Sequence, residues 1–110
     1  MGTLYVVGTP IGNMEDVTFR QLETLKSVDF IAAEDTRVTL KLLNRYGIKK
    51  TLVSYHRHSG ENCALSIMER IKNGENAAIV TDAGMPCISD PGEDLVKICA
   101  ENEVDVKVVP

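Results

Sequence analysis

Five short apolar segments, separated by longer amphipathic segments, recur along the 110-residue chain. Each apolar segment is rich in Val, Ile or Ala and is almost continuously apolar, which is typical of strands buried on both faces. Strands that alternate with helices favour an α/β fold, a five-stranded, mostly parallel sheet with helices on both faces, because right-handed crossovers place the helices there. The predicted strands are 3–8, 28–34, 51–56, 76–82 and 104–110.

Local signals predict where the intervening helices begin and end. Thr18 and Gln21 form an S/T-x-x-Q capping box, and Asp90 can cap the last helix. Two helices are expected to close at Gly47 and Gly74 in the left-handed conformation. The side chains that the first and last helices are expected to bury are Leu22, Leu25, Val28, Leu95, Val96 and Cys99.

Composition narrows the classes of protein to consider. The chain has the size of one domain, and its 44% hydrophobic and 25% charged residues are ordinary for a globular protein. A net charge of −4 argues against a protein that coats nucleic acid through a generally basic surface. A local basic patch is compatible with this charge. No apolar run approaches the ~20 residues of a membrane span. With no signal pattern and no C-x-x-C pair, we expect a cytoplasmic protein without a membrane, disulfide framework or zinc site.

Glycine, proline and polar residues follow the predicted strands in four segments. In a parallel sheet, these segments all begin at the edge formed by the carboxyl ends of the strands, which is where open α/β sheets bind ligands. The sequence therefore predicts a functional site on this edge. The four segments are 8–13, 34–37, 56–60 and 82–92.

The first and fourth segments differ in what they indicate. "GTPIGN" at 8–13 is neither a Walker A sequence nor G-x-G-x-x-G, so a tight strand-to-helix turn and a ligand loop remain equally open. "DAGMPCISDPG" at 82–92 contains two glycines and two prolines. Gly84 permits close approach of a ligand to the main chain, and Pro86 fixes the shape of the loop. We interpret it as a loop that offers main-chain groups to a ligand, the alternative being a long connector.

The segment "AEDTR" places Asp35 at a strand end and Arg37 at the start of a helix. Arg37, Lys41 and Arg45 repeat every four residues and so form one basic stripe on that helix. Such a stripe is most often a solvated helix face. The alternative is a contact with a phosphate backbone.

Two histidines and one cysteine follow the same strand ends. His56 and His58 flank Arg57, and a metal site there would need a further ligand that the sequence does not obviously supply. We interpret both histidines as polar residues of the edge and expect no metal. Cys87, inside the fourth segment, is interpreted as a small apolar filler.

Taken together, GTPIGN, AEDTR and DAGMPCISDPG resemble the opening half of the bacterial 16S ribosomal RNA cytidine 2′-O-methyltransferases, in the tetrapyrrole methylase superfamily. The resemblance covers essentially the whole chain, 1–110, which ends where a strand ends. It implies an N-terminal tetrapyrrole methylase domain, with an absent C-terminal domain. It further implies S-adenosyl-L-methionine bound between the two domains, a homodimer, and 16S rRNA in the small ribosomal subunit as partner.

The resemblance also implies roles for individual residues. Asp35 is the candidate that accepts a proton from the ribose 2′-hydroxyl, and Arg37 is the candidate that positions substrate phosphate. Many relatives have threonine at the position of Met85, so a side-chain hydrogen bond to the cofactor would be lost here, whereas a main-chain contact would survive. The cofactor-binding candidates are Pro10, Ile11, Asp82, Ala83, Gly84, Met85 and Ile88.

Three other functions are compatible with the fold class. A methylase of tetrapyrroles or of another small acceptor would use the same cofactor. A non-catalytic binding half-domain would present only half of a cleft. A phosphoacceptor receiver domain is excluded by its chemistry, because Gly8 and Thr9 stand where it needs an acidic pair, and Tyr55 and His56 stand where it needs an aspartate.

Overall fold

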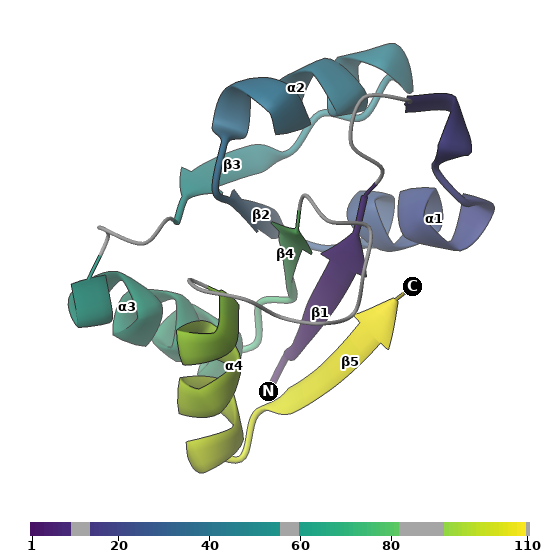
Figure 1. Cartoon of the computed structure of the whole chain (residues 1–110). Helices are drawn as coiled ribbons and strands as arrows, with labels where there is room; N and C mark the ends of the chain where they lie inside the picture. Colours follow the sequence, from purple (N-terminus) through teal and green to yellow (C-terminus); the bar gives the residue numbers. More distant parts are fainter. Residues whose placement is uncertain (10–13, 56–59, 82–91, 110) are drawn as a thin grey trace.

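The structure, a computed structural model, describes residues 1–9, 14–55, 60–81 and 92–109 (Figure 1). The part described contains one sheet. Its strands are β1 (Thr3–Gly8), β2 (Phe30–Ala33), β3 (Thr51–Ser54), β4 (Ala77–Thr81) and β5 (Asp105–Val109). Each lies inside one of the five predicted strands, so the apolar segments identified all five correctly.

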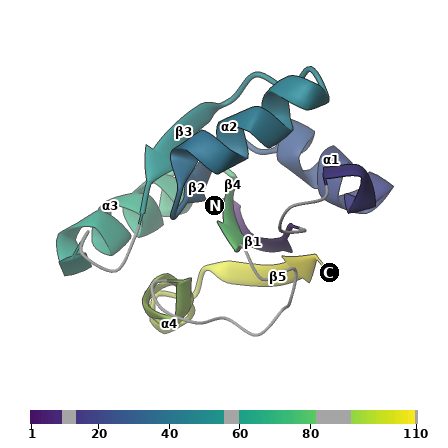
Figure 2. The same ribbon diagram turned by 45° about the horizontal axis from the view of Figure 1, so that its top comes forward.

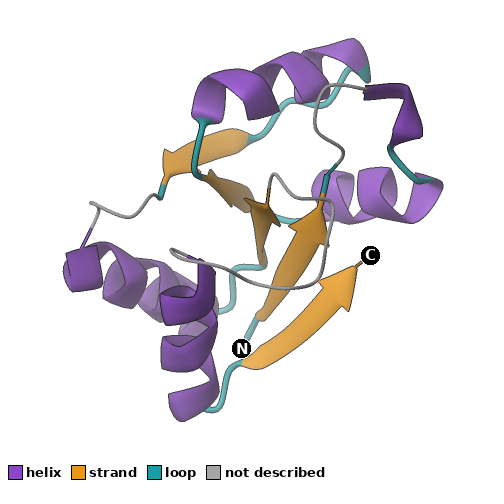
Figure 3. Ribbon diagram, viewed as in Figure 1, coloured by secondary structure: helices purple, strands orange, loops and turns teal. Residues whose placement is uncertain are grey.

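All four strand pairs in this sheet are parallel, and the strand order is β3-β2-β4-β1-β5 (Figure 3). The predicted α/β class is confirmed, and the sheet is wholly parallel rather than mostly so. β4, which enters the sheet fourth in the chain, is inserted between β1 and β2. β1 and β2, which are consecutive in the chain, are therefore not neighbours in the sheet. The ends of β2, β4 and β1 lie side by side at its centre.

Helices cover both faces of the sheet (Figures 1 and 2). Side chains of α1 and α2 pack in one apolar cluster with the strands, and side chains of α3 and α4 pack in the other. The cores of the two clusters include Leu25 and Leu43 on the first face and Ile71 and Leu95 on the second. The helices are α1 (Phe19–Ser27), α2 (Thr36–Arg45), α3 (Gly60–Lys72) and α4 (Gly92–Glu101), with a short 3-10 helix η1 (Met14–Asp16).

The predicted helix ends are largely confirmed. The Gln21 N–H donates to Thr18 Oγ1 at 3.1 Å, and the Thr18 N–H donates to Gln21 Oε1 at 2.9 Å, so the capping box is complete. Gly47 and Gly74 have φ of +68° and +108° and close α2 and α3. Asp90 lies outside the described residues. Among the expected apolar contacts, four side chains are buried and two only partly so; the partly buried ones are Leu22 and Val96.

The two outer strands differ from the expectation of burial on both faces. All four residues of β2 are buried, whereas Thr51 and Ser54 of β3 are exposed and Val108 of β5 is 42% exposed. β3 and β5 are edge strands, so each lacks a neighbour on one side and helices cover it less completely. An apolar run thus marks a strand here, but it does not tell a central strand from an edge strand.

Candidate functional site

The candidate site lies where three strands end side by side. Gly8, the last residue of β1, pairs in register with Thr81, the last residue of β4. On the other side of β4, Ala33 of β2 pairs with Val80. The segments that follow β1, β2 and β4 therefore start from neighbouring points on one edge, as the sequence predicted. We call this edge the carboxyl rim.

The chain leaves these three strands toward different faces of the sheet. β1 and β2 lead to α1 and α2 on one face, whereas β4 leads to α4 on the other. The end of β4 is thus flanked on both sides by strands whose connections run to the opposite face. Such a topological switch point is where open α/β sheets leave room for a ligand. The topology places the carboxyl end of β4, which the 82–92 segment follows in the chain, at this point.

Most of the predicted site residues follow these strand ends directly but lie outside the described residues. Their assignments stay predictions, as do the interpretations of His56, His58 and Cys87. The cofactor-binding candidates concerned are Pro10, Ile11, Asp82, Ala83, Gly84, Met85 and Ile88. Asp35 and Arg37 are the two candidates that the structure describes, and it brings them together.

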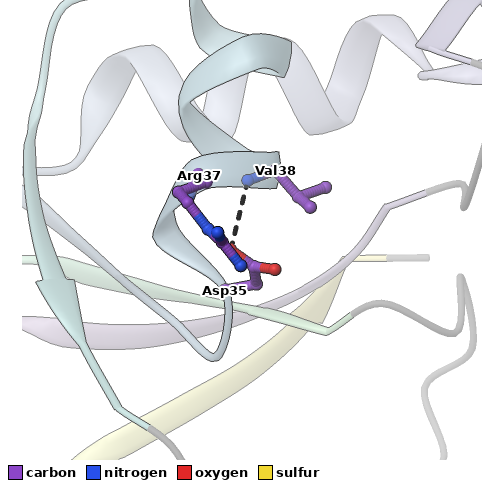
Figure 4. Close-up of polar contacts among 3 residues, drawn as sticks. All are labelled: Asp35, Arg37 and Val38. Carbon is purple, nitrogen blue, oxygen red and sulfur yellow. Dashed lines mark hydrogen bonds and ion pairs between the residues drawn. The ribbon is translucent and has the colours of Figure 1, made fainter.

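Asp35 is the N-cap of α2 at the carboxyl rim (Figure 4). Its Oδ1 accepts hydrogen bonds from the Arg37 N–H at 3.0 Å and the Val38 N–H at 3.4 Å. The Arg37 side chain turns back toward the same oxygen, with Nε 3.5 Å away. The sequence folds this way because an aspartate that follows a buried strand can satisfy the free N–H groups of the next helix.

These contacts favour the ionised form of Asp35. Loss of solvation raises its pKa, but the hydrogen bonds from the Arg37 and Val38 N–H groups and the charge of the Arg37 guanidinium outweigh that effect. The pKa of Asp35 therefore lies below its ordinary value, and the carboxylate is ionised at neutral pH. It can accept a proton, but with a smaller driving force than an unperturbed carboxylate.

Arg37 has its side chain 89% exposed, and its ion pair with Asp35 is long, at 3.5 Å. A guanidinium with this exposure keeps most of its donors available. Planar, forked N–H donors suit the oxygens of a phosphate. The rim therefore combines an ionised carboxylate with an accessible guanidinium at the start of one helix.

Gln21 is a rim residue whose full role the sequence analysis missed. It is only 5% exposed, and its Nε2 donates to the Gly8 carbonyl while its Oε1 accepts from the Thr18 N–H. One amide thus joins the last residue of β1 to the residue that caps α1, so it bridges the two ends of the connection between that strand and that helix. The capping box revealed the second bond. The sequence carried no signal for the first, which depends on how α1 docks.

Among the residues that the structure describes, no group of three or more His, Cys, Asp and Glu side chains could hold a metal ion. Within the same ranges, no helix is long and apolar enough to span a bilayer. The described rim offers the carboxylates of Glu34 and Asp35, the Arg37 guanidinium, the bonded Gln21 amide and main-chain groups.

Comparison with known proteins supports one family. The chain is 60% identical over 97 residues to ribosomal RNA small subunit methyltransferase I of Bacillus subtilis, covering 88% of this chain and 33% of that protein. It is 52% identical over 110 residues to the Thermotoga maritima protein of the same name, covering 100% of this chain and 50% of that protein. The chain thus spans a third to a half of the length of these relatives.

Solved structures share the fold at low sequence identity. The chain matches uroporphyrin-III C-methyltransferase of Thermus thermophilus, complexed with S-adenosylhomocysteine, with a TM-score of 0.71 and 22% identity, over 99% of this chain and 44% of that one. It matches a diphthine synthase with a TM-score of 0.75 and 18% identity, over 98% of this chain and 43% of that one. A family model described as tetrapyrrole (corrin/porphyrin) methylases matches residues 3–110. On that match, the chain belongs to the tetrapyrrole methylase family.

Proposed function

We propose that this chain is the N-terminal domain of an S-adenosyl-L-methionine-dependent methyltransferase that acts on the 2′-hydroxyl of a cytidine in 16S rRNA. The observation that carries the proposal is the 52% identity over all 110 residues to a small subunit rRNA methyltransferase. The proposal includes a second domain that completes the cofactor cleft, a homodimer and a cytoplasmic location, as the resemblance implies.

The cofactor is proposed to lie at the switch point of the carboxyl rim. A neighbour with the same fold was solved with S-adenosylhomocysteine, and the carboxyl end of β4, which the 82–92 segment follows in the chain, lies at that point. Main-chain groups of a glycine- and proline-rich segment suit the adenine and amino-acid moieties of such a ligand. The first segment, 8–13, begins beside the end of β4, since Gly8 and Thr81 are in register.

S-adenosyl-L-methionine supplies an electrophilic methyl group when it is bound. The residues of this chain would orient the ribose 2′-hydroxyl for in-line attack and take its proton. Asp35 is ionised and stands at the rim, so it is our candidate acceptor. Because its basicity is lowered, positioning should supply more of the rate than proton transfer. Arg37 would hold a substrate phosphate next to it.

The proposal can be tested with a chimera in which this chain replaces the matching half of the Thermotoga maritima protein. Calorimetric titration with S-adenosylhomocysteine should show binding by the chimera and weaker or no binding by the 110-residue chain. Micromolar binding by both would mean that the 110-residue chain supplies most of the free energy of cofactor binding. Binding by neither, while the unaltered relative binds, would reject the methyltransferase assignment in favour of a non-catalytic binding domain.

Methyl transfer then identifies the acceptor. Radiolabelled cofactor should transfer its methyl group to unmethylated small ribosomal subunits, and alkaline digestion should leave the product as a 2′-O-methylated, hydrolysis-resistant dinucleotide. Label on a corrin- or porphyrin-type acceptor, with none on the ribosomal subunits, would identify a small-acceptor methylase instead.

A further inference from the structure

Positive charge is concentrated on one side of the molecule. Residues 36–50 contain five of the 12 Lys and Arg residues of the chain and no Asp or Glu, although the chain as a whole has a net charge of −4. These five residues lie on α2 and on the turn that leads into β3. We call them the basic face: Arg37, Lys41, Arg45, Lys49 and Lys50.

The basic face points to solvent. The buried residues of α2 are Thr39, Leu42 and Leu43, and the two leucines belong to the apolar cluster under the helix. The charged side of the helix is therefore left outward. Arg37, Lys41, Arg45 and Lys49 are exposed, and Lys50 is half-buried. Figures 1 and 2 show α2 on the outside of the sheet along its length. The basic stripe that the sequence predicted on this helix is therefore exposed to solvent.

Only the arginines of the basic face have acidic partners among the described residues. Arg37 approaches Asp35, and Arg45 Nη2 lies 3.0 Å from Glu15 Oε1 of η1. Within the described ranges, no carboxylate lies at ion-pair distance from Lys41, Lys49 or Lys50. Both arginine pairs are exposed, where such pairs contribute little and exchange readily. The three lysines are the unneutralised part of the face.

We propose that the basic face binds the phosphate backbone of the RNA substrate and leads the strand to the carboxyl rim. This surface rests on the proposed function, because it takes RNA to be the substrate. Arg37, Lys41 and Arg45 follow one another at i, i+4 intervals of about 6 Å along the helix axis. The row starts beside Asp35 at the rim, so a strand that follows α2 places one of its nucleotides there.

Among the described residues, α4 on the opposite side of the sheet carries no comparable positive charge. On α4, Asp94 and Glu101 are exposed with Lys97, so acidic residues outnumber basic ones there. A chain with this asymmetry attracts a polyanion to α2 and repels it from α4. Charge complementarity thus favours one occupant, a phosphate backbone, over an apolar or basic partner.

The test compares two triple variants with the same change in charge. Lys41→Gln, Lys49→Gln and Lys50→Gln remove the unpaired lysines of the basic face. Lys72→Gln, Lys97→Gln and Lys107→Gln remove three exposed lysines from α3, α4 and β5. Fluorescence anisotropy with a labelled single-stranded RNA measures affinity as salt is varied. Circular dichroism confirms that each variant is folded.

The basic-face triple should bind RNA about tenfold more weakly than the parent chain at low salt. Each phosphate contact on a single strand adds about 0.7 to the slope of log affinity against log salt, so three lost contacts should lower it by about 2. The control triple should retain most of the affinity. Equal losses in both triples, or no RNA binding by the parent chain at about 50 mM salt, would overturn the proposal.

Two further readouts separate this surface from other assignments. Self-association of the parent chain without RNA, abolished by the basic-face triple, would assign the face to a second copy and overturn the proposal. In the chimera, the basic-face triple should bind S-adenosylhomocysteine as the parent does, because no lysine of the face belongs to the proposed cofactor loops. If the basic face binds RNA but the chimera binds no cofactor, the proposed function is rejected and the basic face is retained as an RNA-binding surface.

Discussion

The amino ends and the carboxyl ends of the strands use their polar groups in opposite ways. We call the side of the sheet where the strands begin, opposite the carboxyl rim, the amino edge. At the amino edge, the polar groups bond to one another. Asn76 Oδ1 accepts from the Thr3 N–H at 2.9 Å, and the Asn76 N–H donates to Asp29 Oδ2 at 2.7 Å. Arg70 and Glu75 form a two-pronged pair at 2.8 and 2.9 Å, and the guanidinium lies 3.7 Å from the centre of the Phe30 ring.

At the carboxyl rim, by contrast, polar groups bond to the ends of helices and keep capacity for a further partner. Asp35 caps α2 through one oxygen, and Arg37 next to it is largely exposed. Among the described rim residues, Gln21 alone is buried with both ends of its side-chain amide bonded. The amino edge therefore holds the strands together, whereas the rim is fixed by one buried amide and otherwise presents charge. Substitutions at the two edges should separate stability from activity.

The largest expected effect is on activity at the rim. Asp35→Asn in the chimera should reduce methyl transfer by about 100-fold or more, because the proton acceptor is lost. The unfolding midpoint should stay unchanged, since asparagine caps helices as well as aspartate does. Radiolabelled methyl transfer to small ribosomal subunits and thermal unfolding measure the two quantities.

Asp35→Ala is the matched control for the cap. It removes both the carboxylate and the bonds to the Arg37 and Val38 N–H groups, so it should lose activity and also lower the unfolding midpoint. Full activity of Asp35→Asn would remove Asp35 from the chemistry and leave it a helix cap. Asp35 would then have a purely structural role, like the polar residues of the amino edge.

A smaller effect is expected at Gln21, where the rim itself depends on a buried bond. Gln21→Leu leaves the Gly8 carbonyl and the Thr18 N–H without partners. Each buried group left unpaired costs about 1–3 kcal/mol, so the free energy of unfolding should fall by about 2 kcal/mol or more. Urea titration of the 110-residue chain measures it. An unchanged midpoint would show that water replaces the amide.

Gln21→Glu tests the same buried bonds through the pH dependence of the free energy of unfolding. A glutamate keeps an acceptor for the Thr18 N–H, but when ionised it cannot donate to the Gly8 carbonyl. Burial should raise the pKa of this carboxyl above its unfolded value, so the folded form binds a proton more tightly. The variant should therefore be weakest near neutral pH and should recover toward the parent as pH falls from the raised folded pKa to the unfolded pKa of about 4.3, with the recovery complete below that value.

The sequence predicted the framework of both edges better than the bonds within them. Five apolar segments sufficed for the strands, because burial in a parallel sheet demands continuous apolar runs. Strand order, which puts β4 between β1 and β2, depends on how helices pack and left no local pattern. The rim was predicted as a set of strand ends. Its convergence at the switch point followed only from that order.

Individual contacts show the same limit. The capping role of Gln21 was predictable because it depends on a spacing of three residues. Its bond to Gly8, and that of Asn76 to Thr3, join residues 13 and 73 positions apart, so no local pattern could reveal them. Asp35 was predicted as a functional residue, and its capping bonds give it a structural role as well.

At the amino edge, Asn76→Ala should affect stability alone. It leaves the Thr3 N–H without its 2.9 Å acceptor at the start of β1 and should lower the free energy of unfolding by about 1–2 kcal/mol. Asn73→Ala is the control. Asn73 is exposed, and its side chain bonds to none of the described residues, so the change should stay within about 0.5 kcal/mol. Equal midpoints in urea for the two variants would contradict a bonding role for the Asn76 side chain.

The smallest effect is expected at the turn from α4 into β5, which departs from the other turns of the amino edge. The N–H groups of Ile48, Glu75 and Val104 each donate to the carbonyl five residues earlier, so α2, α3 and α4 end in the same motif. Its left-handed position is glycine in the first two turns but Glu103, with φ +63°, in the third. The sequence therefore predicted two of these helix ends and gave no signal for the third.

Glu103→Gly should make the third turn like the other two. The strain of a left-handed non-glycine residue is about 1 kcal/mol or more, and the added freedom of glycine in the unfolded chain offsets part of it. The net gain in the free energy of unfolding should be about 0.5 kcal/mol. Glu103→Ala keeps the strain without the charge and should show no gain, whereas Gly47→Ala should lose about 1 kcal/mol. A gain from Glu103→Ala equal to that from Glu103→Gly would assign the cost to the charge of the side chain rather than to its backbone.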